Sequence, residues 1–395
     1  MSHTQPGANS PASRWAARIA LLFLAPLLVF GLVELFAWSI GVEPAATSEE
    51  FKDRKVIDDC RWHPDHLENN CAQAIRPEDG TRRIYVLGAS SVLGHPFGET
   101  RNIPHFVAEH LDTLYPGEYE VINLAMPCKG SFYVRQCAER AIETRPEAVV
   151  VYSGHNDFSG FMSRWPGLLM WMERSGWWVI ELQRLLARTR SWTLINPRVV
   201  EPLEFAYDPG ADLAPPDVAR AFATILEGYE ENLEKVLERA REEKTTVIWV
   251  TPVGNLSEHP VSKKDWGLVF LQNKRDAKDA KPWSLEYAQG IVAFREQRFD
   301  DAIAAFKRAR DHFPRTRAPA LLNERLRELD ASHEDLHLVD FEAQLDAIGR
   351  EEGIGCTFFG TDEYCDGVHP NPRTNRLIGH SIADRISELR EGQAR

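Results

Sequence analysis

Five short apolar runs, separated by long amphipathic stretches, limit most strongly what this chain can fold into. The runs occupy residues 83–87, 120–124, 148–152, 246–250 and 336–341. They are rich in valine and isoleucine and mostly do not alternate with polar residues, which is typical of parallel strands that helices cover on both faces. Helical periodicity marks the stretches between them, notably 216–244, 318–330 and 372–392. The pattern predicts an α/β fold with a doubly wound, parallel, five-stranded sheet.

A nearly all-apolar segment, residues 19–42, precedes the strands. At about 1.5 Å of rise per residue it is long enough to cross a hydrocarbon core of roughly 30 Å, so we expect a transmembrane helix. Arg14 and Arg18 precede it and acidic residues follow it. The positive-inside rule then puts residues 1–18 in the cytoplasm and the rest of the chain on the periplasmic side of the inner membrane. A cleaved signal peptide is the competing interpretation. Glu34, inside the segment, indicates either a partner helix or a carboxyl that the anchor tolerates.

The overall charge argues against a nucleic-acid partner. The chain has 46 Lys and Arg against 59 Asp and Glu, a net charge of −13, so it is not built to cover a polyphosphate. Its 43% hydrophobic and 27% charged residues are typical of a globular protein. We expect residues 43–81 to form a linker and residues 82–395 to form one α/β domain with helical insertions.

The six cysteines fall into three pairs that are close in the sequence: Cys60 and Cys71, Cys128 and Cys137, and Cys356 and Cys365. In the oxidising compartment expected for an exported domain, local disulfide pairing is the simplest hypothesis, although the sequence cannot choose among the pairings. Buried free thiols are the alternative. The spacing matches neither a zinc ribbon nor a thioredoxin-type site.

Polar motifs follow the predicted strands at their carboxyl ends, where α/β sheets bind ligands. Residues 88–91 (GASS) end the first strand, residues 123–130 (NLAMPCKG) follow the second, and residues 153–157 (SGHND) follow the third. Residues 366–369 (DGVH) lead into the last helical stretch. Each motif alone is weak, but this order along the chain is hard to obtain by accident.

The arrangement resembles the GDSL/SGNH hydrolase superfamily. Its Gly-Asp-Ser block is matched by residues 88–90, its Gly-x-Asn-Asp block by residues 154–157, and its Asp-x-x-His block by residues 366–369. The stretches RIYVLGASSVLG and VVVYSGHNDF look like a bacterial membrane-anchored branch that carries helical-repeat insertions. In the second block, where the superfamily commonly has glycine, this chain has Cys128, with Gly130 two residues further on. The resemblance implies a flavodoxin-like sheet and a serine hydrolase.

These residue types suffice for acyl-transfer chemistry. A serine hydroxyl becomes nucleophilic when a neighbouring base removes its proton, so Ser90 is the expected nucleophile and His369 the expected base. Asp366 can accept a hydrogen bond from the other ring nitrogen and orient the imidazole. We prefer Ser90 to Ser91 because it stands two residues after Gly88, at the strand–helix elbow.

The tetrahedral intermediate of such a reaction needs hydrogen-bond donors aimed at its oxyanion. The Ser90 N–H and the Asn156 side-chain amide are two candidates. A backbone N–H of the second block is the third, and the sequence leaves it open between Cys128 and Gly130.

Blander interpretations compete with catalysis. Ser90 could be a helix N-cap, Asn156 and the following aspartate could close a turn, and His369 could merely begin the last helix. Three blocks in the expected order favour catalysis. His63 and His66 have a metal-like spacing but no clear third ligand, so we expect no metal site and no cofactor.

Two insertions lie outside the motifs. Residues 161–200 are rich in tryptophan and predict a lid, an acyl pocket or a membrane-facing surface, or more simply a helical hairpin packed on the sheet. Residues 283–314 match the spacing of one tetratricopeptide repeat. A single repeat cannot bury its own face, so we expect it to dock on the hydrolase body, with peptide binding as the alternative.

Two classes of function remain. The first is an exported, membrane-anchored serine esterase that acts on a small acyl ester, such as an O-acetyl group, of an envelope carbohydrate or lipid. An O-acyltransferase would use the same site. The second class is a catalytically idle envelope scaffold that binds a protein partner through the repeat-like insertion. The intact set of Ser90, Asn156, Asp366 and His369 favours the esterase.

Overall fold

The computed structural model describes residues 11–42, 44, 80–127, 129–158, 185–186, 188–199, 215–256, 282–312, 318–352, 358–359 and 367–393. The chain divides into two compact units. One comprises Met1–Asp58 with Trp177–Leu203, and the other comprises Asp59–Gly176 with Glu204–Arg395. The second unit contains the sheet, and the first contains the N-terminal helix.

The second unit is built on one sheet of five strands in the order β2-β1-β3-β4-β5, and every neighbouring pair is parallel. The strands are β1 (Arg82–Gly88), β2 (Tyr119–Asn123), β3 (Ala148–Tyr152), β4 (Thr246–Val250) and β5 (Leu336–Val339). The prediction of a doubly wound, five-stranded parallel sheet is confirmed, and β3 and β4 have the predicted bounds.

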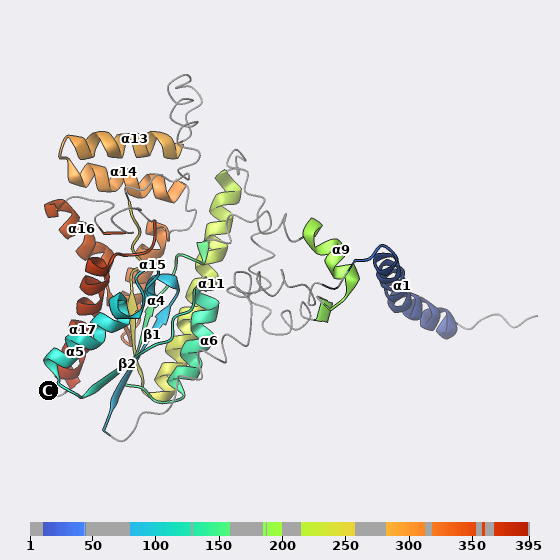
Figure 1. The fold of residues 1–395 in the computed structure, drawn as a ribbon, viewed down its shortest axis with the longest axis horizontal. Coiled ribbons are helices and arrows are strands. Elements are labelled where there is room, and N and C mark those ends of the chain that lie inside the picture. Colours follow the sequence, from blue (N-terminus) through green and yellow to red (C-terminus); the bar gives the residue numbers. More distant parts are fainter. Residues whose placement is uncertain are drawn as a thin grey trace, which may run out of the picture. The chain divides into compact units, whose positions relative to one another are not determined.

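Helices cover both faces of the sheet, as the non-alternating apolar runs require. They are α4 (Ser90–Leu93), α5 (Ile103–Leu114), α6 (Ser131–Ile142), α11 (Pro215–Glu243), α15 (Ala320–Ser332), α16 (Phe341–Glu352) and α17 (Pro372–Gln393), with a 3-10 turn, η2 (Glu99–Arg101). Within β1, Tyr85 and Leu87 pack with α6, α11 and α15, whereas Ile84 and Val86 pack with α5, α16 and α17. Figure 1 shows α6 and α11 on one side of the strands and α5 and α17 on the other. Since successive strand residues point to opposite faces, each run fills two cores.

Helices α13 (Pro282–Arg295) and α14 (Phe299–His312) form the helical hairpin expected at residues 283–314. Gly290 allows the Phe306 ring to lie against the backbone of α13, because a Cβ on Gly290 would stand 2.6 Å from that ring. The two helices share a small apolar cluster with Leu256, which follows β4. The hairpin therefore packs on the segment that follows β4, within the unit that contains the sheet, while its assignment as a tetratricopeptide repeat stays a prediction.

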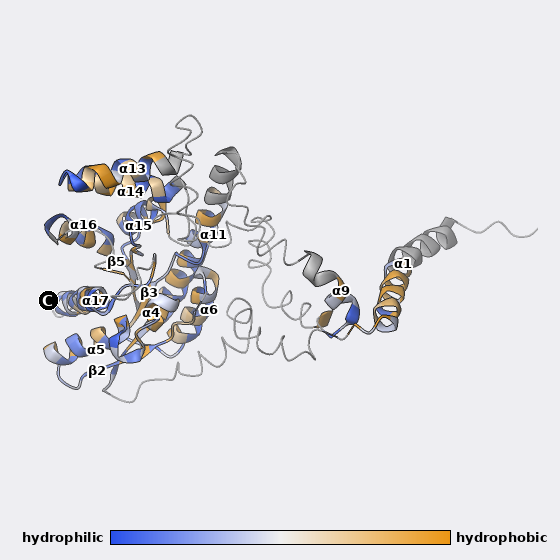
Figure 2. Ribbon diagram, turned by 45° about the horizontal axis from the view of Figure 1, so that its top comes forward, coloured by the Kyte–Doolittle hydropathy of each residue, from blue (hydrophilic) through white to orange (hydrophobic). Residues whose placement is uncertain are grey.

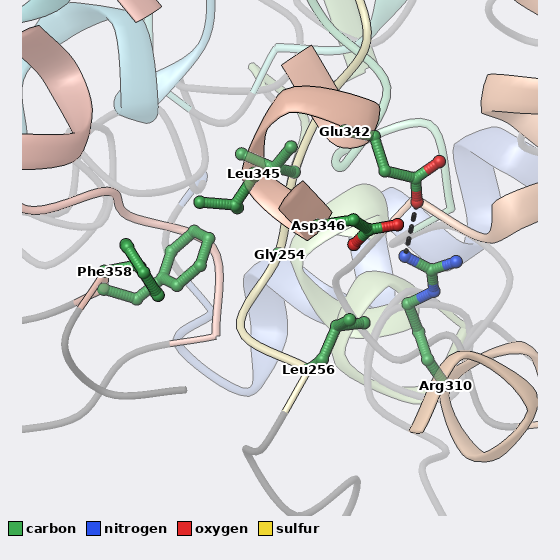
Figure 3. Close-up of a pocket in the computed structure, with 9 residues that line it drawn as sticks. Gly254, Leu256, Arg310, Glu342, Leu345, Asp346 and Phe358 are labelled. Atoms are coloured by element: carbon green, nitrogen blue, oxygen red, sulfur yellow. Dashed lines mark hydrogen bonds and ion pairs between the residues drawn. The ribbon is translucent and has the colours of Figure 1, made fainter. Parts of the chain in front are cut away.

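A network of ion pairs around the buried Arg310 and Glu342 fixes the hairpin to α16. Arg310 of α14 is only 2% exposed, and its Nη1 lies 3.5 Å from Glu342 Oε1. Lys307 Nζ lies 2.6 Å from Asp346 and 3.4 Å from Glu342. From α15, Arg327 Nη2 donates to Glu342 Oε2 at 3.0 Å. Figure 3 shows Arg310 and Glu342 meeting at a pocket that α16 and the segment after β4 also line.

The N-terminal unit contains α1 (Pro11–Ser39) and α9 (Arg190–Val199). Many large apolar side chains of α1 from Leu24 onward are exposed, and this part of the helix is mostly coloured as hydrophobic in Figure 2. In the part of the chain that the structure describes, no helix combines the length and the apolar character needed to cross a membrane. Helix α9, which belongs to the insertion at 161–200, groups with α1.

Glu34, the acidic residue of the apolar segment, contacts the start of α9. Its Oε1 accepts the Arg190 N–H at 2.9 Å, and its Oε2 accepts the Ser191 N–H at 2.7 Å and the Ser191 hydroxyl at 2.5 Å. The first N–H groups of a helix have no intrahelical acceptor, and the Glu34 carboxylate fills that role here. Of the two interpretations of Glu34, the structure favours the partner helix.

Several predictions concern residues outside the described ranges. Most of the linker at 43–81, most of the tryptophan-rich insertion, both histidines of the HxxH pattern and every cysteine except Cys137 lie there. Cys137 is buried in α6. The predicted disulfides therefore stay predictions.

Glu342→Gln should lower the free energy of unfolding by about 3 kcal/mol at neutral pH, because it removes a charge partner from the buried Arg310. Burial alone raises the pKa of Glu342, but the charges of Arg310, Lys307 and Arg327 outweigh it and hold the pKa below its ordinary value. The Glu342 carboxylate thus stabilises the fold at every pH above its ordinary pKa. This stabilisation is lost as the pH falls through the lower pKa of the folded state. Urea unfolding at neutral pH and in acid should show the variant and the wild type converging in acid.

Asp300→Asn is the matched control for this prediction. Arg350 of α16 donates to Asp300 of α14 at 2.6 Å, so the pair joins the same two helices, but the Asp300 side chain is 78% exposed. Its removal should cost under about 1 kcal/mol. Equal losses of unfolding free energy in Glu342→Gln and Asp300→Asn would contradict the claim that the ion pairs around Arg310 and Glu342 fix the hairpin to α16.

Candidate active site

The first motif forms a sharp strand-to-helix turn. β1 ends at Gly88, Ala89 has an extended backbone, and Ser90 begins the short helix α4. A side chain at Gly88 does not fit, because its Cβ would stand 2.3 Å from the Tyr152 carbonyl oxygen and 2.4 Å from Val92 Cγ2. The turn therefore presents Ser90 at the carboxyl end of an inner strand, where sheets of this kind bind ligands.

Ser90 and His369 meet although they stand 279 positions apart in the sequence. The Ser90 Oγ lies 2.8 Å from His369 Nε2, which is a normal hydrogen-bond distance. A serine hydroxyl so placed can pass its proton to the imidazole when it attacks a carbonyl carbon. The structure brings together the nucleophile and the base that the sequence predicts.

Two hydrogen bonds hold the loop that carries His369. The Ser91 hydroxyl donates to the Val368 carbonyl at 2.8 Å, and the Asn255 N–H donates to the Gly367 carbonyl at 2.9 Å. Ser91 is buried. The second serine of the motif therefore positions the histidine loop, which agrees with the choice of the first serine as the nucleophile.

The third motif lines a pocket together with Ser90. His155 and Asn156 form part of the wall of this pocket, and Val368 of the histidine loop lies there as well. His155 Nδ1 accepts the Ala318 N–H at 3.0 Å, which ties the motif to the segment that leads into α15. Asn156 thus lines the same pocket as the candidate nucleophile.

The second motif contacts Asn156 through Lys129. The Asn156 side-chain amide donates to the Lys129 carbonyl oxygen at 3.0 Å. Because an amide NH₂ group carries two N–H groups, this bond is compatible with a second one to an oxyanion. Gly130 occupies the N-cap position of α6, whereas Cys128, the other candidate donor, lies outside the described residues.

Asp157, the last residue of the third motif, binds the start of α6. Its Oδ1 accepts the Ser131 N–H at 2.8 Å and the Ser131 hydroxyl at 2.5 Å. Asn232 of α11 donates in turn to the Ser131 hydroxyl at 3.0 Å. Burial raises the pKa of Asp157 to about 6, although the bonds from Ser131 act to lower it. In the sequence, Asp157 could be recognised only by its place in the third block. No motif marked the contacts of Ser131 with Asp157 and Asn232.

Asp366, the third predicted member of the catalytic set, lies outside the described residues. Its bond to His369 therefore stays a prediction. Among the residues that are described, no group of three or more His, Cys, Asp or Glu side chains could hold a metal ion.

Comparison with known proteins finds similar structures only. No protein-family model and no curated protein matches the chain. A lipase/acylhydrolase from Enterococcus faecalis is 15% identical, with a TM-score of 0.37, over 78% of this chain and 97% of that one. A GDSL-like lipase from Bacteroides thetaiotaomicron is 12% identical, with a TM-score of 0.35, over 82% and 97%. A psychrotrophic esterase from Pseudoalteromonas sp. is 11% identical, with a TM-score of 0.33, over 78% and 99%.

The chain is therefore similar to structures of GDSL-like lipases, acylhydrolases and esterases, the class that its motifs resemble. Likeness at these TM-scores and identities bears on neither activity nor substrate. The case for a function rests on the side chains of the site itself.

Ser91→Ala should lower kcat about tenfold and leave KM nearly unchanged, because loss of the bond to the Val368 carbonyl loosens the loop that carries His369. Hydrolysis of p-nitrophenyl acetate by the full-length protein measures both constants. Ser332→Ala is the control, since it removes a hydroxyl that donates to the Leu329 carbonyl at 3.0 Å in α15. A kcat that is unchanged in both variants would show that the histidine loop does not need Ser91.

Proposed function

We propose that this protein is a serine ester hydrolase of the GDSL/SGNH type. The observation that carries the proposal is the 2.8 Å contact between Ser90 Oγ and His369 Nε2 at the carboxyl edge of the parallel sheet. A serine that only caps a helix needs no histidine, and a histidine that only begins a helix needs no serine. Their contact beside a pocket that Asn156 lines favours catalysis over both blander interpretations.

In the proposed reaction Ser90 Oγ attacks the ester carbonyl carbon while His369 Nε2 takes the hydroxyl proton. When the tetrahedral intermediate collapses, the imidazolium returns this proton to the leaving alcohol. Water then attacks the acyl-serine, with the same imidazole as base, and releases the acid. Asp366 is proposed to orient the imidazole through its other ring nitrogen.

We propose that three donors stabilise the oxyanion of each tetrahedral intermediate. They are the Ser90 N–H, the Asn156 side-chain amide and a backbone N–H of the second block. Losing one such donor typically costs about 2.7–4 kcal/mol of transition-state stabilisation. Both Gly130 and Cys128 belong to the second block. Asn156 donates to the Lys129 carbonyl, and the Gly130 N–H of the same trans peptide points the opposite way, so this bond does not favour Gly130 over Cys128.

We also propose that residues 19–42 hold the enzyme at the inner membrane and that it acts on the periplasmic side. Arg14 and Arg18 before this segment and the exposed apolar side chains of α1 support the proposal. The corresponding substrate is a small acyl ester, such as an O-acetyl group, of an envelope carbohydrate or lipid.

Ser90→Ala should reduce hydrolysis of p-nitrophenyl acetate by at least about 10³-fold, because no other group replaces the nucleophile. Ser91→Ala is the matched control, a neighbouring hydroxyl removed from the same turn, and should keep roughly a tenth of the activity. Full activity in Ser90→Ala, or equal losses in the two variants, would contradict the assignment of the nucleophile.

A reporter fused after Arg395 tests the proposed location. Alkaline phosphatase at this position should be active, since it folds in the periplasm, and a fluorescent protein that folds only in the cytoplasm should be dark. Exchanging Arg14 and Arg18 for glutamate should weaken this preference. The opposite pattern in the unchanged protein would refute the orientation.

A further inference from the structure

Asp157 caps helix α6 from a distant part of the chain. Gly130, at the N-cap position, has no side chain that could accept a hydrogen bond from the first turn. The Asp157 Oδ1 accepts the Ser131 N–H at 2.8 Å instead, together with the Ser131 hydroxyl. The positive end of a helix favours an anionic acceptor at this place. The third block thus supplies the cap that the second block lacks.

Gly130 is small because the Asp157 carboxylate lies against it. A Cβ on Gly130 would stand 3.2 Å from Oδ1 and 3.4 Å from Cγ of Asp157. Since the φ of Gly130 is −90°, which any residue adopts, the glycine provides space here and not backbone freedom. Asn156, the neighbour of Asp157, holds the carbonyl of Lys129. Asn156 and Asp157, two consecutive residues of the third block, therefore bind residues 129–131 of the second block through hydrogen bonds.

We propose that Asp157 is a positioning residue of the oxyanion hole: by holding Ser131 it fixes the Lys129 carbonyl, and this carbonyl holds the Asn156 side-chain amide in place for the reaction at Ser90. The inference rests on the proposed ester hydrolysis and deepens it. The Gly130 N–H belongs to the same trans peptide as that carbonyl and points away from Asn156, so the inference concerns the Asn156 donor. The Ser131 N–H is already given to Asp157.

A carboxylate suits this role better than an amide. Hydrogen bonds to an ionised acceptor are shorter and roughly twice as strong as those between neutral groups. Asn at position 157 would still offer one oxygen to Ser131, so it is the conservative variant. We assign Asp157 no role in proton transfer, because its described bonds go to Ser131. The base His369 bonds to Ser90.

Asp157→Ala in the full-length protein should lower kcat about 100-fold and leave KM within about threefold, because a displacement of about 1 Å in a reacting group costs that much rate. Asp157→Asn should recover kcat to within about tenfold of the wild type. Leu111→Ala, a fully buried position on α5 at the opposite face of the sheet, is the control that loses stability without losing kcat.

A double-mutant cycle tests the contact itself. Gly130→Ala should lower kcat when Asp157 is present, because the new methyl group pushes against the carboxylate. In an Asp157→Ala background this space is open, so the two losses should not add. If the losses of kcat in the two single variants add fully in the double variant, the proposed contact between Asp157 and residues 130–131 is contradicted.

Hydrogen exchange of the peptide that spans residues 129–142 separates this inference from the proposed function. We expect faster exchange in Asp157→Ala than in Leu111→Ala or Ser90→Ala, whether or not any ester is hydrolysed. Unchanged protection in Asp157→Ala, or a kcat equal to that of the wild type, would overturn the inference. Normal protection in a wild-type protein that hydrolyses no ester would contradict the hydrolase proposal alone.

Discussion

Parallel pairing of β1 with β2 and with β3 is the constraint on which the rest of the structure depends. Because parallel strands run in one direction, the segments that follow these three strands start at the same edge of the sheet. Ser90 follows β1, Gly130 follows the loop after β2, and Asn156 follows β3. The histidine comes from elsewhere, the loop before α17. That helix packs with α5 on one face of the sheet, and this packing brings His369 to the same edge.

Bringing polar groups together at such an edge has a cost, since each buried donor or acceptor must find a partner. The structure offsets part of this cost with bonds between segments: Ser91 with the histidine loop, Asp157 with the start of α6, and Arg310 of α14 with Glu342 of α16. Each of these bonds also fixes the distance between two segments. Burial of polar groups and preorganisation of the candidate site are therefore two consequences of the same contacts.

The sheet could be predicted because its cause is local. The inner runs are apolar on both faces, and this pattern can be read directly for β3 and β4. Ser90, Asn156 and His369 could be predicted because they stand in short motifs with fixed spacing. The contacts of Glu34 with α9, of Asp157 with Ser131 and of Arg310 with Glu342 join residues 156, 26 and 32 positions apart. Such pairs of polar residues have no period, so only the fold reveals them.

The central claim is that His369 makes Ser90 reactive. A fluorophosphonate probe reacts with an activated serine, so labelling of the full-length protein followed by peptide mapping tests the claim directly. We expect the label on Ser90 in the wild type and a rate of labelling at least about 100-fold lower in His369→Ala. A label on any other residue, or equal labelling of Ser90 in the two proteins, would contradict the claim.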